Sequence, residues 1–521
     1  MHKIIISLKE DVKKQSEQNK KQSEEIRKQS EENEHLRYLV KYFRDLKFAV
    51  KSEKTNNSPQ SLLFNEAEVV ASGNPDSSKD EEIAVKSHKR KRGGRRAFPK
   101  EIPRIEIPHD LSDEEKQCTC GNVMTVLERE IKEKLDIIPA KIIVYQHIYP
   151  KYACLPCLNG KKPGHHFKVA EIHPEILPKS IATAGLFAHI LTNKFCDHLP
   201  YNRQEGIFAR HGIDISKANM CNWQTQFYEQ YDRLENFFFD DIFHAPVIIA
   251  DETTNKVMNE PGRKNTQLSY MFAFAALFKG RPIRLFHYRE TRSAKFLKDH
   301  FEGYSGILQT DGFKSYDPLC KVLNIPHAGC WAHLRRKFRD YLNFLPKDTF
   351  SGEILKKIKA LYQLERDWRE EKIDPNRLRQ HRQEFSKPIV IEIFNLIEAR
   401  KNEILPQSDL GKIVSHAIKQ KTKLFMFLDF PQLALDTNAV ENAIRPFAVG
   451  RKNWMISGSP RGAHSSALIY SLIETAKANG LNPYYYLRYL FEKLPLCKND
   501  EEIKQLLPHR IDPKIIEDTS I

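Results

Sequence analysis

The chain has 521 residues, too many for one hydrophobic core, so we expect several folding units. Lys and Arg number 83 against 68 Asp and Glu, and the net charge of +15 favours a polyanionic partner such as nucleic acid. No run of about 18 apolar residues occurs and the opening apolar run is too short for a signal peptide, so we expect a soluble, cytoplasmic protein. The nine cysteines then indicate metal binding rather than a disulfide framework.

Residues 1–50 are predicted to form an N-terminal helix. No Gly or Pro interrupts residues 8–50, and the apolar side chains near the end of this range fall on one helical stripe. The stripe is thin upstream, so the segment is either a weak, partner-dependent coiled coil or a solvated single helix.

Residues 51–98 are predicted to be a linker that ends in a basic arm. The first part is rich in Ser, Asn, Asp and Glu and cannot bury enough apolar surface to order itself. The end, KRKRGGRRAFP, suits an arm that follows a phosphate backbone or a minor groove, although a merely soluble basic loop would have the same composition. The DNA-binding candidates in the arm are Lys89, Arg90, Lys91, Arg92, Arg95 and Arg96.

Residues 99–170 contain two cysteine pairs and predict a zinc-binding module. The pairs are separated by 33 residues of alternating apolar character, including 142–145, and a hairpin there would bring four thiolates together in the tetrahedral arrangement that zinc prefers. The candidate ligands are Cys118, Cys120, Cys154 and Cys157. Reduced free thiols are the alternative, and His147, His165 or His166 are possible substitute ligands.

Residues 171–240 predict a helix-turn-helix. We expect helices over 182–193 and 202–210 and a third that begins after Ser216 as N-cap and runs through Trp223. A turn at Gly212 would join the last two helices. Lys217, Asn219 and Asn222 could then reach base edges or phosphates, but small three-helix units also serve as scaffolding.

Residues 241–345 change to a strand pattern. Strands are expected over 246–250, 268–278 and 283–288, followed by a helix over 293–301 and a strand over 306–310. Asp251 follows the first strand and Asp311 the last, so one mixed sheet would place both carboxylates side by side.

Two carboxylates in that position suit phosphodiester chemistry. Two Mg²⁺ (or Mn²⁺) ions about 3.5–4 Å apart can stabilise both oxygens of an in-line displacement, and they prefer carboxylate ligands. Glu441 is the candidate third ligand, on a helix expected from residue 439, and Arg445, Arg451 and Lys452 beside it would hold a DNA backbone. In the alternative interpretation each Asp merely caps a turn and Glu441 forms a surface ion pair.

The rest of the chain is predicted to be mainly helical. Residues 346–432 read as a helical insertion, and 433–521 complete the core with the Glu441 helix and the C-terminal helices. Cys330 and His333 in Cys-Trp-Ala-His could be half of a metal site, but no second pair lies near in sequence. We therefore expect Cys330 to be structural and His333, Arg335 and Arg336 to face DNA or the active site.

Five strings resemble one known family: ADETTNKV, LQTDGFKSY, HAGCWAHLRRKF, NAVENAIRPFAVGRKNWMISGS and SLIETAKANGLNPYYYLRYL. They look like the transposase of the bacterial insertion sequence 66 family, and the resemblance covers nearly the whole chain. It implies a DDE transposase with an RNase H-like core, in which Asp251, Asp311 and Glu441 match the acidic triad. It also implies binding to terminal inverted repeats and cooperation with element-encoded accessory proteins. The chain departs from the family at Cys118 and Cys120, where C-x-x-C is usual.

The sequence therefore predicts a multidomain α+β protein. An RNase H-like α/β core with a helical insertion would follow an N-terminal coiled coil, a zinc ribbon-like module and a helix-turn-helix. We expect a transposase that cuts element ends and transfers them to target DNA, acting at least as a dimer because two ends must be held together. An RNase H-like nuclease or resolvase, or a non-catalytic DNA-binding regulator, are the alternatives.

Overall fold

The structure is a computed structural model that describes residues 142–149, 151–153, 167–169, 173–293 and 296–518. The chain divides into two compact units, residues 74–172 and residues 1–73 together with 173–521. The predicted N-terminal helix, the basic arm and all four candidate zinc cysteines lie outside the described residues.

The described part of the first unit is a short antiparallel pair, β1 (Lys151–Ala153) with β2 (Phe167–Val169). Residues 142–149, part of the segment where a hairpin was expected between the cysteine pairs, have no regular structure, and the four apolar side chains at 142–145 are exposed. Alternating apolar residues form a strand only where a partner strand and a core cover one face, and the described residues supply neither at this point.

Four helices open the second unit: α5 (Ala184–Phe195), α6 (Tyr201–Arg210), α7 (Lys217–Tyr231) and α8 (Arg233–Ile242). The first three lie within two residues of their predicted starts, and the side chain of Ser216 caps α7 as expected by accepting the N–H of Asn219. Buried aromatic side chains of these helices belong to a core that the C-terminal helices share. The ring centres of Phe187 on α5 and Phe491, for example, are 4.7 Å apart.

A five-stranded mixed sheet forms the centre of this unit: β3 (Val247–Asn255), β4 (Ser269–Phe278), β5 (Arg281–Arg289), β6 (Ile307–Gln309) and β7 (His327–Ala328). Its order is β5-β4-β3-β6-β7, with β5, β4 and β3 antiparallel in turn and β3, β6 and β7 parallel. The predicted order of strands is confirmed, together with the mixed sheet. Two details were wrong: Asp251 lies inside β3 rather than at its end, and the two-residue β7 was not expected.

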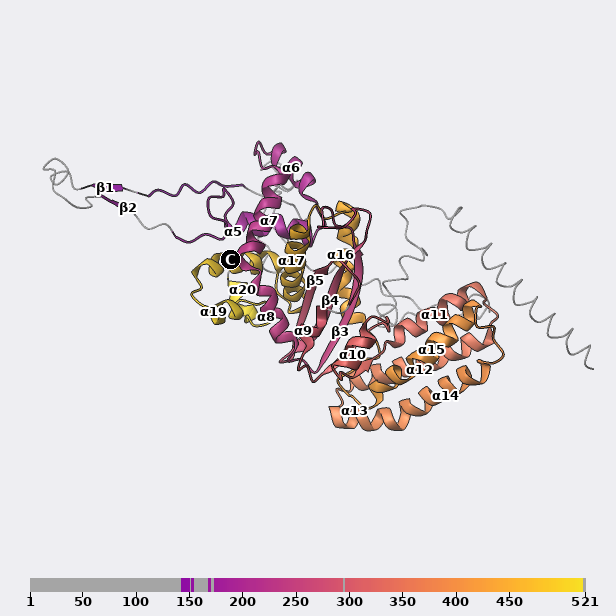
Figure 1. The fold of residues 1–521 in the computed structure, drawn as a ribbon. Helices are drawn as coiled ribbons and strands as arrows, with labels where there is room; N and C mark the ends of the chain where they lie inside the picture. Colours follow the sequence, from indigo (N-terminus) through magenta and orange to yellow (C-terminus); the bar gives the residue numbers. More distant parts are fainter. Residues whose placement is uncertain (1–141, 150, 154–166, 170–172, 294–295, 519–521) are drawn as a thin grey trace, which may run out of the picture. The chain divides into compact units, whose positions relative to one another are not determined.

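Helices surround the sheet and extend from one edge of it (Figure 1). Two short helices, α9 (Leu297–Phe301) and α10 (Tyr316–Val322), flank β6. After β7 the chain forms α11 (Trp331–Phe344), α12 (Thr349–Glu370), α13 (Pro375–His381), the π-turn η2 (Arg382–Ser386), α14 (Lys387–Arg400), α15 (Asp409–Phe425) and the 3₁₀ turn η3 (Met426–Leu428). These helices pack around a second core, to which α12 contributes Ile354, Ile358 and Leu361 at helical spacing.

The C-terminal part returns to the sheet as α16 (Asn438–Trp454), α17 (Pro460–Ala478), α18 (Pro483–Lys493), η4 (Leu494–Leu496), α19 (Asp500–Gln505) and α20 (Pro513–Asp518). Helix α17 runs along the open edge of β5 and meets it with hydroxyl groups. Ser471 accepts the N–H of Phe286 at 2.8 Å, and Thr475 accepts that of Arg284 at 2.9 Å. Across the described ranges, no helix has the length and apolar character needed to cross a membrane.

Candidate active site

Asp251 lies in β3, and Asp311 lies in the turn that follows the neighbouring parallel strand β6. The register pairs Ile249 of β3 with Gln309, the last residue of β6, and each aspartate follows this pair by two residues along its own segment. Neighbouring strands are about 4.8 Å apart, and residues at the same level of a parallel pair point to the same face. The parallel pairing of β3 and β6 therefore brings the two acids into the same region, and the charge of Asp311 acts on Asp251.

The turn after β6 fixes the position of Asp311. Its Oδ1 accepts the N–H of Phe313 at 2.8 Å, and Gly312 between them has a φ of +87°. A side chain on Gly312 would be strained by that φ and would also lie within 2.7–2.8 Å of Gln420 on α15. Gln420 in turn donates to the carbonyl of Gly312 at 3.2 Å, so the helical insertion contacts this turn directly.

Glu441 is held near the sheet although 130 residues separate it from Asp311. Three successive carbonyl groups before its helix are each bound by a different element: Arg382 of η2 donates to Leu433 O at 3.0 Å, Gln309 of β6 to Ala434 O at 2.8 Å, and the Trp331 N–H of α11 to Leu435 O at 2.8 Å. Sheet, insertion and α11 thus determine together where α16 begins, and Glu441 lies in its first turn.

The carboxylate of Glu441 contacts three groups. Arg336 Nη2 donates to Oε2 at 3.3 Å, and the hydroxyl of Thr437 lies 3.1 Å from Oε1. His333 Nδ1 is 3.6 Å from Oε1. Side-chain exposures of 17–21% for Glu441, His333 and Arg336 leave the group reachable from solvent. His333 and Arg336 therefore face the candidate active site, which is one of the two positions expected for them.

Negative charge is concentrated around Asp251. Burial, then the charges of Asp311, Glu252 and Glu441, raise the pKa of Asp251 well above the usual range for a carboxyl. Glu252 is paired separately: Arg292 Nε donates to it at 2.7 Å and the Tyr316 hydroxyl at 2.7 Å. Burial raises the pKa of Glu252, and these two donors oppose the rise.

This donor set fits divalent cations with a preference for oxygen ligands. Asp251, Asp311 and Glu441 are close enough for each charge to raise the cost of ionising Asp251, and a cation between them would remove that cost. The three acids do not, however, form a group with all ligand atoms within 4.8 Å. Within the described residues the group that meets that spacing is Cys330, His333 and Glu441.

The predicted DNA contacts divide into two sets. Lys217, Asn219 and Asn222 are exposed on α7, where a helix could present them to a groove, and Lys452 is exposed on α16. The others make internal contacts: Arg335 stacks on Tyr362 with 5.7 Å to the ring centre, Arg336 binds Glu441, Arg451 donates to the hydroxyls of Thr253 and Thr254 on β3, and Arg445 is half-buried on α16.

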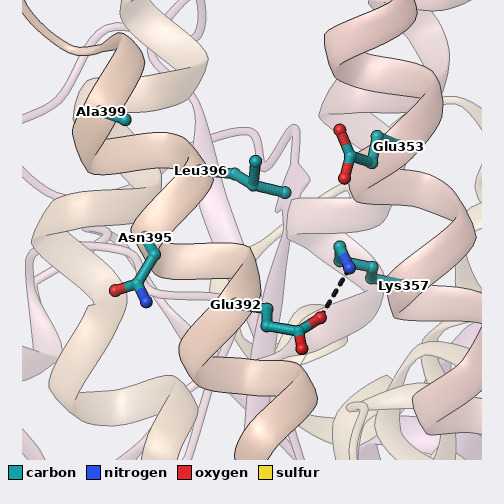
Figure 2. Close-up of a pocket in the computed structure, with 6 residues that line it drawn as sticks. All are labelled: Glu353, Lys357, Glu392, Asn395, Leu396 and Ala399. Carbon is teal, nitrogen blue, oxygen red and sulfur yellow. Dashed lines mark hydrogen bonds and ion pairs between the residues drawn. The ribbon is translucent and has the colours of Figure 1, made fainter.

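A surface pocket lies between α12 and α14, away from the acids (Figure 2). Glu353 and Lys357 line it from α12, and Glu392, Asn395, Leu396 and Ala399 from α14. Lys357 and Glu392 are joined across it at 2.6 Å, which is an ordinary interhelical ion pair. None of the residues in this pocket belongs to the candidate site.

Several residues that shape the site were missed by sequence reasoning. Thr437 is the N-cap residue of α16, but its side chain makes no capping hydrogen bond and instead contacts Glu441. Arg292, Tyr316 and Gln309 were not singled out, because each acts through a partner far away in sequence. The only available signal was their proximity to Asp251 and Asp311 along the chain.

Comparisons with known proteins agree over most of the chain. The family model described as "Transposase IS66 family" matches residues 179–465, and "IS66 C-terminal element" matches 471–509. "Zinc-finger binding domain of transposase IS66" matches 115–157, the range that includes all four candidate zinc cysteines, and "Transposase C of IS166 homeodomain" matches 35–107.

Relatives in Sinorhizobium fredii are similar over most of their length. The uncharacterized protein y4qI is 28% identical over 499 residues, covering 92% of this chain and 90% of its own. The uncharacterized protein y4jD is 31% identical over 413 residues, covering 76% and 78%. The uncharacterized protein y4hP is 25% identical over 477 residues, covering 86% and 83%.

The family match implies a transposase of the DDE class. The chain belongs to the IS66 transposase family, whose model covers more than half of its residues.

Proposed function

We propose that the chain cuts the ends of an insertion sequence and joins them to target DNA, with Asp251, Asp311 and Glu441 as the catalytic acids. The main support is that the fold brings together carboxylates from β3, the turn after β6 and the first turn of α16, where the charges of Asp311 and Glu441 help to raise the pKa of Asp251. The strand order and directions, three antiparallel strands followed by two parallel ones, also favour an RNase H-like core.

The chemistry would consist of two in-line displacements. Water attacks a phosphodiester at the element's end and releases a 3′ hydroxyl, which then attacks a phosphodiester of the target and displaces its 3′ oxygen. Mg²⁺ or Mn²⁺ ions held by Asp251, Asp311 and Glu441 would stabilise the attacking and leaving oxygens. Arg336, His333 and Thr437 would keep the Glu441 carboxylate turned toward the sheet.

DNA recognition would come from other parts of the chain. The exposed polar residues of α7 and the basic arm would contact the terminal inverted repeats, while Arg445, Arg451 and Lys452 would lie along the backbone near the acids. Zinc bound by the cysteine pairs would brace the N-terminal module. We also propose that the protein acts in the cytoplasm, at the nucleoid, as a homo-oligomer with element-encoded accessory proteins.

The test is an end-cleavage and strand-transfer assay on DNA that bears the element's terminal repeats, with Mg²⁺ present. Asp251→Asn, Asp311→Asn and Glu441→Gln should each lower both steps by about 10²-fold or more, because each removes a ligand that acts in the transition state. Asp340→Asn, an exposed carboxylate on α11, is the matched control and should react normally.

The products separate this proposal from its alternatives. Joined products support a transposase, cut products without joining indicate a nuclease or resolvase, and binding without reaction indicates a regulator. Full activity of any one of the three acid variants would contradict the assignment of that acid.

A further inference from the structure

Cys330, His333 and Glu441 form a second possible cation site at the edge of the candidate active site. Cys330 is the N-cap residue of α11, His333 lies in its first turn, and Glu441 lies in the first turn of α16. Their ligand atoms all lie within 4.8 Å of one another. The two helix starts are held together by the hydrogen bond from Trp331 to Leu435, so the cluster is a fixed feature of the fold.

His333 supplies an independent observation that points to a ligand at this cluster. Its Nδ1 is buried and has no hydrogen-bond partner, and it lies 3.6 Å from Oε1 of Glu441. A buried polar atom without a partner is costly, by about 1–3 kcal/mol in mutational data. The separation of 3.6 Å is too long for a hydrogen bond but is close to the distance between two ligand atoms that share one cation, since each would lie about 2 Å from the metal.

The chemistry of the three groups selects the class of cation. A thiolate, an imidazole and a carboxylate are borderline-soft ligands that suit Zn²⁺, whereas Mg²⁺ prefers oxygen ligands alone. Three protein ligands would leave a fourth position for water. Glu441 can serve through Oε1, which accepts a hydrogen bond from the Thr437 hydroxyl at 3.1 Å, because Arg336 contacts the other oxygen.

We propose that Cys330, His333 and Glu441 bind Zn²⁺ or a similar thiophilic cation, and that this cation withdraws Glu441 from the pair Asp251 and Asp311. The binding site stands on geometry alone. Its consequence, that zinc inhibits the magnesium-dependent reaction, rests on the proposed function, because it requires Glu441 to be the third catalytic acid.

The binding test uses the full-length protein and counts bound zinc after equilibration with ZnSO₄ and removal of free metal. Cys330→Ser and His333→Ala should each bind about one zinc ion fewer per chain than the wild type. Any zinc held by the four-cysteine module is present in every variant and cancels. Cys320→Ser is the matched control, because Cys320 is equally buried, at 5% against 4%, but lies outside the cluster.

A second measurement protects the test against misfolding. Co²⁺ in place of Zn²⁺ gives a thiolate charge-transfer absorption, which should be weaker in Cys330→Ser and altered in Glu441→Gln, a change that preserves side-chain shape. Asp251→Asn should leave both the zinc count and the cobalt spectrum unchanged. Equal zinc counts and spectra in the wild type and in Cys330→Ser would overturn the proposal.

The two proposals fail in different ways. Unchanged zinc binding in the cluster variants, with DNA cleavage lost in Asp251→Asn, refutes the zinc site and supports the catalytic acids. Reduced zinc binding in the cluster variants, with no DNA reaction by the wild type, supports the zinc site and refutes the proposed function. If both hold, micromolar zinc should inhibit cleavage by the wild type, and failure to inhibit would show that zinc does not withdraw Glu441.

Discussion

The fold keeps the carboxyl group of Asp251 in an environment that disfavours its ionised form. It lies among three other acids, and the folded protein raises its pKa because ionisation there is opposed by burial and by like charge. A group whose pKa is higher in the folded than in the unfolded chain destabilises the fold at any pH above its unfolded value. The candidate site therefore stores repulsion that a bound divalent cation would relieve.

Replacement of Asp251 by Asn should stabilise the protein in buffer without divalent cations. We expect a gain of about 1–2 kcal/mol at pH 8, since one pKa unit corresponds to about 1.4 kcal/mol and part of the repulsion is screened by solvent. The gain should shrink as pH falls through the raised folded pKa and vanish below about pH 4, the unfolded value, where the carboxyl is protonated in both states. Urea unfolding at a series of pH values measures this.

Added Mg²⁺ provides the second half of this test. It should stabilise the wild type more than Asp251→Asn, because the variant has both lost a ligand and lost the repulsion. Asp340→Asn should respond to pH and Mg²⁺ as the wild type does. A variant that is less stable than the wild type at pH 8 would show that Asp251 makes a favourable contact instead.

At the scale of elements, the helical insertion positions the candidate site as well as enlarging the chain. Arg382 is 2% exposed and binds Glu365 through two contacts of 2.7 Å. The same guanidinium donates to the carbonyls of Phe427, Phe430 and Leu433, and so fixes the segment that leads into α16. Planar, many-donor geometry of this kind is available only from Arg.

Arg382→Ala should destabilise the protein by about 3–5 kcal/mol, because it leaves Glu365 buried without its partner and three carbonyls without a donor. We expect a lower urea midpoint and loss of protection from amide exchange in residues 427–441. Arg377→Ala, an exposed residue on α13, should have no measurable effect. Equal stability of the two variants would mean that the segment is held by other contacts.

The sequence was sufficient to predict most helices and strands, but it was insufficient to predict the contacts between elements that are far apart in the chain. Strand patterning located β3 to β6 and the two aspartates, and the capping signal of Ser216 located α7, because these are local consequences of periodicity and hydrogen bonding. The hydrogen bonds from Arg382 to the carbonyl of Leu433 and from Gln309 to the carbonyl of Ala434 were not predictable. The two residues in these bonds are 51 and 125 positions apart in the sequence. The hairpin expected between the cysteine pairs is not formed at 142–149 for the same reason, because its formation depends on what packs against it.

At the scale of the whole molecule, the net charge of +15 can contribute to DNA binding only where the basic side chains are exposed. Arg336 and Arg451 are engaged inside the protein, whereas Lys217 on α7 is exposed. A phosphate contact releases counterions, so its removal should lower both the DNA affinity and the salt dependence of that affinity.

Lys217→Ala should reduce the slope of log affinity against log salt concentration by about one and weaken binding to all sequences alike. Asn222→Ala, if it contacts a base edge, should instead reduce the preference for terminal repeats over random DNA. Fluorescence anisotropy at several salt concentrations measures both. Lys359→Ala on α12 makes the same change of charge on an exposed surface and should leave the slope unchanged. An equal change in the slope would mean that only overall charge matters.

The row of hydroxyls that α17 presents to β5 constrains how copies of the protein can assemble. Ser471 and Thr475 bind the outward N–H groups of Phe286 and Arg284, so α17 covers this part of the β5 edge against pairing with a strand from another subunit. Two subunits that bridge a pair of DNA ends would therefore have to meet through a surface other than this edge. A subunit interface of that kind can dissociate after each reaction cycle without disturbing the sheet that contains Asp251.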